Sequence, residues 1–112
     1  MSEISTHVLD TSLGRPAAGI SVTLDARDGA SSWKHVARGA TDADGRLRDF
    51  AGQQLPAGTY RLTFDTAAYF ESLHTPSFYP EVAIVFEVRD PAAKYHVPLL
   101  ISPYGYSTYR GS

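Results

Sequence analysis

Histidine is the side chain in this sequence best suited to moving protons near neutral pH, because imidazole titrates in that range. The chain has four, His7, His35, His74 and His96. No pair shows the His-x-x-x-His spacing with which a helix binds zinc. An isolated histidine is more often an ordinary strand or surface residue than a catalytic one, so the local pattern has to decide which of the four could act together.

Strand-like alternation distinguishes His7 and His96 from the other two histidines. In STHVLD, His7 would share one face of a strand with Ser5 and Leu9. In AKYHVPLLIS, His96 would share a face with Pro98 and Leu100. The expected position of these faces is the outside of a sandwich. Because leucines are unusual on a surface that meets only water, the two faces point to a ligand or partner surface.

The end of the chain is also unusual, because termini normally fray and consist of small polar residues. Here GYSTYR leads into Tyr109, Arg110, Gly111 and Ser112, which add an aromatic ring and a permanent cation. Tyr109 would lie on the same outward side as Ser107. A glycine in this position permits close approach of another backbone or side chain.

An Asp-Gly turn precedes a further candidate, Arg46. TDADGR resembles the start of a calcium loop, but Arg46, Arg48 and Phe50 stand where the later oxygen ligands would be needed. We therefore interpret the stretch as a turn. Arg46 is then either a solvated arginine, which the sequence alone slightly favours, or an anion clamp. The chain has neither a Gly-x-Ser-x-Gly nucleophile motif nor a phosphate-binding glycine loop.

The elements that must position these side chains are mostly strands. Seven segments are alternating or apolar: STHVLD, GISVTLD, WKHVARGAT, GTYRLTFD, EVAIVFEV, AKYHVPLLIS and GYSTYR. Turn-forming residues separate them, which predicts a two-sheet antiparallel sandwich of seven to eight strands. DTAAYFESL departs from the alternation and predicts one short helix, capped by Asp65 or Thr66.

Length and composition limit the possible classes of protein. The 112 residues fit a single domain spanning 1–112, and the absence of cysteine excludes disulfides. A net charge of -2 gives no basic footprint for nucleic acid. No apolar run approaches the roughly 20 residues of a membrane span, and the first ten residues lack the pattern of a signal peptide. We expect a cytoplasmic protein that binds neither nucleic acid nor membrane.

Four stretches together resemble the 5-hydroxyisourate hydrolases, the transthyretin-like enzymes of urate breakdown. They are HVLDTSLGRPA, TDADGR, FYPEV and YHVPLLISPYGYSTYRGS. The terminal Tyr-Arg-Gly-Ser is the most specific of these marks, because transthyretin shares the LD…GxPA and SPYxYST patterns but lacks that ending and the histidines. The resemblance implies a transthyretin-like (prealbumin-like) fold, assembled as a homotetramer, a dimer of dimers, with active sites in a central channel.

The resemblance also implies roles for individual residues. His7, Arg46 and His96 would be catalytic, and His7, Arg46 and the terminal residues Tyr109, Arg110, Gly111 and Ser112 would bind substrate. The reaction would hydrolyse 5-hydroxyisourate to 2-oxo-4-hydroxy-4-carboxy-5-ureidoimidazoline, without cofactor or metal. One imidazole would take a proton from the attacking water, and the sequence leaves open which of the two does so.

Two other functions are compatible with parts of the pattern. One is a non-catalytic transthyretin-like carrier or binding module. The other is a zinc protein, because two histidines on one wall can trap zinc. The predicted homotetramer also has a physical reason that does not depend on the resemblance. EVAIVFEV and GYSTYR would each be aggregation-prone if left at a sheet edge. Edge-to-edge pairing of two copies would cover both edges.

Overall fold

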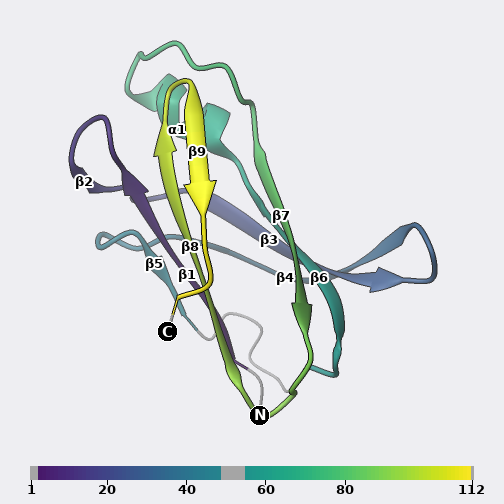
Figure 1. The fold of residues 1–112 in the computed structure, drawn as a ribbon. Helices are drawn as coiled ribbons and strands as arrows, with labels where there is room; N and C mark the ends of the chain where they lie inside the picture. The colour runs from purple at the N-terminus through teal and green to yellow at the C-terminus, as the bar shows by residue number, and fades with distance from the viewer. Residues whose placement is uncertain (1–2, 49–54, 112) are drawn as a thin grey trace.

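Two β-sheets face each other in the computed structural model, which describes residues 3–48 and 55–111 (Figure 1). The first sheet has the order β2-β1-β8-β9, with β5 also paired to β1, and the second has the order β4-β3-β6-β7. The strands of the first sheet are β1 (Glu3–Asp10), β2 (Arg15–Pro16), β5 (Arg46–Leu47), β8 (Lys94–Ser102) and β9 (Gly105–Thr108). Those of the second are β3 (Ser21–Asp28), β4 (Ser32–Ala40), β6 (Gly58–Phe64) and β7 (Val82–Val88).

The predicted two-sheet sandwich with one short helix is confirmed, with two differences in detail. The described residues form nine strands rather than seven or eight. The sequence did not predict β2 and β5, because strands of two residues are too short to show an alternating pattern. The pairing of β1 with β8 is parallel, whereas the sequence was expected to form antiparallel pairs. Parallel pairing needs a long crossover between the two strands, and here nearly the whole chain between Asp10 and Lys94 separates them.

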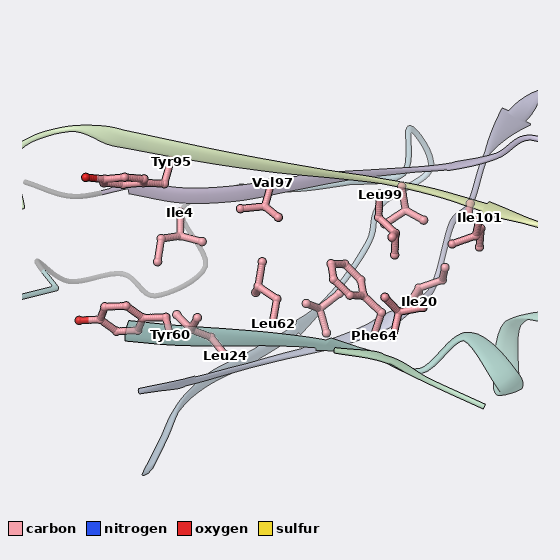
Figure 2. Packing of buried hydrophobic residues seen from close by; sticks show 14 of the residues in the cluster. Ile4, Ile20, Leu24, Tyr60, Leu62, Phe64, Tyr95, Val97, Leu99 and Ile101 are labelled. Carbon is pink, nitrogen blue, oxygen red and sulfur yellow. The ribbon is translucent and has the colours of Figure 1, made fainter. Parts of the chain in front are cut away.

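The core lies between the two sheets (Figure 2). Burial alternates along β1, so that Ile4, Thr6 and Val8 are buried while Ser5 and His7 are only partly covered. Leu99 from β8 and Leu62 and Phe64 from β6 are fully buried in the same cluster. Burying each such side chain contributes about 1.5–3 kcal/mol. Since a shift by one residue would turn this apolar set toward water, the core fixes which residues of β1 and β8 face outward.

The helix α1 (Thr66–Ser72) begins where the sequence predicted. The side chain of Asp65 is the N-cap and accepts a hydrogen bond from the backbone N–H of Ala68 at 3.2 Å. Phe70 is buried, and the Tyr69 hydroxyl donates to the buried Asp10 carboxylate at 2.7 Å. The helix is thereby tied to the end of β1. No helix in residues 3–48 and 55–111 has the length and apolar character needed to cross a bilayer.

Strands β7 and β9 each end the order of their sheet, so EVAIVFEV and GYSTYR both lie at sheet edges. Both present apolar or aromatic groups to the surface: Val85 of β7 is 54% exposed and Tyr106 of β9 is 44% exposed. Unpaired backbone groups along an edge of this kind are a ready template for pairing with another chain.

Candidate active site

His7 and His96 lie on neighbouring strands and on the same outward face of the first sheet. In the parallel register of β1 and β8, Ser5 is opposite His96 and His7 is opposite Pro98. His7 and His96 are therefore diagonal neighbours, two residues apart along adjacent strands. Both are partly buried, whereas the residues on either side of His7 face the core.

A third element, β5, brings Arg46 beside His7. The two residues are directly opposite in the antiparallel pairing of β1 with β5. Gly45 has a φ of 75° and lies so close to β1 that a Cβ atom at this position would overlap the carbonyl oxygen of Val8. In return, the backbone N–H of Val8 donates to the carbonyl oxygen of Gly45 at 2.8 Å. A glycine is required here because it tolerates both the positive φ and the close approach.

The carboxylate of Asp42 organises the turn before β5. Its Oδ1 atom accepts hydrogen bonds from the backbone N–H groups of Asp44 and Arg46, at 2.9 Å and 3.0 Å. The hydrogen bond from the Arg46 backbone, together with the nearby Arg48 and Arg46 guanidinium groups, holds the pKa of Asp42 below its usual value. TDADGR is thus a turn, as predicted, and it leads directly into Arg46 at the start of β5.

Two hollows flank this arginine. One, of about 660 Å³, includes His7, Leu9 and Asp42 in its lining. The other, of about 280 Å³, includes Ser5 and His96. The side chains of Arg46 and Arg48 line both hollows. Arg46 is exposed and lies between the hollow that contains His7 and the hollow that contains His96.

The environment of His96 favours its neutral form. Its Nδ1 atom and the Ser5 hydroxyl share a hydrogen bond of 2.9 Å. Burial of the ring, followed by electrostatic repulsion from the neighbouring side chains of His7, Arg46 and Arg48, lowers the pKa of His96 below its usual value of 6.5. Near neutral pH this imidazole is unprotonated and can accept a proton from a bound water.

The C-terminal segment packs directly against His96. The backbone N–H of Gly111 donates to the carbonyl oxygen of His96 at 2.9 Å. A Cβ atom on Gly111 would overlap Cδ2 of the His96 ring and would lie 3.3 Å from Cγ of Pro98. The guanidinium of Arg110 stacks over the Tyr95 ring, with 4.7 Å between its carbon and the ring centroid. The tail is therefore ordered as far as Gly111.

The tail residues line a third hollow, of about 320 Å³, which contains His96, Tyr109 and Arg110 but neither His7 nor Arg46. Tyr109 follows the last residue of β9 and is 59% exposed. The structure thus brings His7, Arg46 and His96 together and places Tyr109 and Arg110 around His96. Ser112 lies outside the described residues.

The other two histidines are elsewhere. His35 is on β4 in the second sheet, with its Nδ1 atom 3.7 Å from the Asp25 carboxylate, and His74 follows α1. Sequence reasoning gave no role to Ser5 or Arg48. The position of Ser5, two residues before His7 on the same face, was the available signal. In the described part of the chain, no three His, Cys, Asp or Glu side chains form a group that could hold a metal ion.

Known protein families, sequences and solved structures resemble this chain along nearly its whole length. A model of the HIUase/Transthyretin family matches residues 4–111. The 5-hydroxyisourate hydrolase of Caulobacter vibrioides is 47% identical over 116 residues, which cover the full length of both chains. The structure of Klebsiella pneumoniae 5-hydroxyisourate hydrolase aligns over all of both chains with a TM-score of 0.88 and 42% identity. Sea bream transthyretin in complex with thyroxine also has a TM-score of 0.88, at 32% identity, with 96% of this chain and 93% of that one covered.

Proposed function

The chain belongs to the HIUase/transthyretin family and is a 5-hydroxyisourate hydrolase of urate degradation, and we propose that it acts by water attack assisted by His7, His96 and Arg46. The observation that supports this mechanism best is their arrangement on one outward face. Arg46 is opposite His7, and His96 is a diagonal neighbour of His7 with a lowered pKa.

In the proposed reaction, the oxygen of a water molecule attacks a carbonyl carbon of the six-membered ring while one imidazole takes the water proton. The lowered pKa of His96 favours this residue as the base. The ring C–N bond then breaks and the proton passes to the departing nitrogen, which leaves a carboxylate and a ureido group. Arg46 stabilises the developing oxyanion through charge-assisted hydrogen bonds.

The proposed roles can be tested by substituting the two histidines with asparagine. 5-Hydroxyisourate is generated from urate with urate oxidase, and the decay of its ultraviolet absorbance is followed with and without the protein. His7→Asn and His96→Asn should each lower turnover by about a hundred- to ten-thousand-fold, the usual contribution of general acid–base catalysis. Circular dichroism should be unchanged, because both side chains point away from the core.

His35→Asn on the second sheet is the matched control and should keep normal turnover. Normal turnover in both the His7 and His96 variants would refute the assignment. A carrier would bind the substrate without accelerating its decay. Activity that survives treatment with a chelator would exclude a catalytic metal.

For the assembly, we propose a homotetramer in which β7 and β9 pair with the same strands of a second copy. The partly apolar outward face around Leu9 and Leu100 would then be covered by a second dimer. This arrangement would protect both edges and enclose the histidines in a cleft lined by more than one subunit. Light scattering should give about four times the 12.2 kDa mass of one chain. A monomer that remains fully active when dilute would refute this model.

A further inference from the structure

We propose that Arg48 is a second anion-binding residue of the site, which acts with Arg46 to hold the acidic edge of the substrate and to set a preference for negatively charged rings. This inference rests on the proposed function and deepens it. It concerns a residue to which neither the sequence pattern nor the family resemblance gave a role.

Arg46, in β5, and Arg48, directly after β5, line the same two hollows. Leu47 lies between them, pairs with Thr6 of β1 and packs against the hydrophobic core. Both flanking arginines are exposed. Each lines the hollow that contains His7 and also the hollow that contains His96. The two guanidinium groups therefore stand at the boundary between the two imidazoles, where a flat ring contacting both histidines would lie.

Asp42 and Asp44 line the hollow of His7 together with Arg46 and Arg48, but neither carboxylate binds a guanidinium group directly in the part of the chain that the structure describes. Among residues 3–48 and 55–111, no hydrogen bond or ion pair involves either guanidinium group. The nearby Asp42 carboxylate already accepts backbone hydrogen bonds from Asp44 and Arg46. Glu3, on the His96 side, lies 3.8 Å from the ammonium group of Lys94. Among the described residues, the N–H donors of both guanidinium groups therefore remain available to an oxygen of a ligand.

The chemistry of the hollows fits a planar, oxygen-rich anion. Two guanidinium groups offer forked donors that match carbonyl or carboxylate oxygens in one plane. One arginine can stabilise charge at the reacting carbonyl while the other holds a different oxygen of the same ring. Because a guanidinium group stays protonated near neutral pH, Arg48 would bind and orient the ring rather than transfer a proton. Its loss should consequently weaken binding more than it slows the chemical step.

The test compares Arg48→Gln and Arg48→Lys with Arg38→Gln. Arg38 is a matched control because it is an exposed arginine on β4 of the other sheet, and the same charge is removed. Two quantities are measured: KM and kcat with 5-hydroxyisourate, and the Kd for urate by calorimetry at low and high salt. Urate is a stable, flat, acidic ring and serves as the binding probe.

We expect Arg48→Gln to raise both the KM and the Kd for urate by about tenfold, with kcat within about twofold of normal, as for loss of one exposed charge-assisted contact. Arg48→Lys should recover part of the loss, and Arg38→Gln should match the unaltered protein. High salt should reduce the difference, because exposed charges are screened.

Three results would overturn the role of Arg48: a KM and Kd for Arg48→Gln equal to those of Arg38→Gln, a fall in kcat without a rise in KM, or an unaltered protein that does not bind urate. Absence of turnover by the unaltered protein would instead overturn the proposed function. The urate titration would still decide whether Arg48 binds an anionic ring, so the two failures are distinguishable.

Discussion

Replacing Gly111 with alanine tests whether the C-terminal segment supports the active site. The added Cβ atom would overlap Cδ2 of the His96 ring and lie 3.2 Å from its Cγ atom. Either the tail or the ring must move to relieve this overlap. The ring is held on its other side by the hydrogen bond between Nδ1 and the Ser5 hydroxyl.

The contacts that the Gly111→Ala variant would lose determine how far its stability and activity fall. If the tail moves, it loses the hydrogen bond to the His96 carbonyl, worth about 1 kcal/mol, and the stacking of Arg110 on Tyr95, worth about 0.5–1 kcal/mol. A loss of this size lowers Tm by less than about 10 °C. If the ring moves instead, a displacement near 1 Å costs up to about 100-fold in rate. We therefore expect kcat/KM to fall measurably, by up to about 100-fold, with a modest change in Tm.

Absorbance decay of 5-hydroxyisourate and differential scanning calorimetry measure the two quantities. Gly105→Ala is the matched control, because a Cβ atom there would meet only the Ser102 hydroxyl oxygen, at an ordinary 3.7 Å. It should keep kcat/KM within about twofold of normal, since no catalytic contact is disturbed. A Gly111→Ala variant with normal kcat/KM would refute the reasoning.

Three other predictions follow from the same contacts. The acid limb of kcat/KM should lie below pH 6.5, because the lowered pKa of His96 keeps its imidazole neutral to more acidic pH; a limb centred above pH 6.5 would contradict this. Asp42→Ala should lower kcat/KM by up to about 100-fold by releasing the turn that presents Arg46, and an unchanged value would argue against that role. Tyr69→Phe should lower the free energy of unfolding by about 1.5–3 kcal/mol, because the buried Asp10 carboxylate loses a hydrogen bond, while turnover stays normal; urea unfolding measures the change, and unaltered stability would disprove it.

Local patterns determined much of the fold and the direction of the key side chains. A strand repeats every two residues, so alternation in STHVLD and AKYHVPLLIS was sufficient to place His7 and His96 outward, as the burial pattern confirms. The helix and its Asp65 cap could likewise be predicted from the sequence, because an N-cap involves residues only three positions apart. The turn before Arg46 could also be predicted from its Asp-Gly pair, because a turn is formed by residues close together in the sequence.

Only the tertiary structure decided which of these segments become neighbours. The parallel register of β1 and β8 brings His96 to Ser5 and, diagonally, to His7. The two-residue strand β5 places Arg46 opposite His7, although two residues are too few to predict a strand from an alternating pattern. Strand pairing joins residues far apart in the chain and depends on how two whole sheets bury their apolar faces, for which no local pattern exists. The lowered pKa of His96 follows from the same pairing, because its burial and its charged neighbours come from segments that only the folded chain assembles.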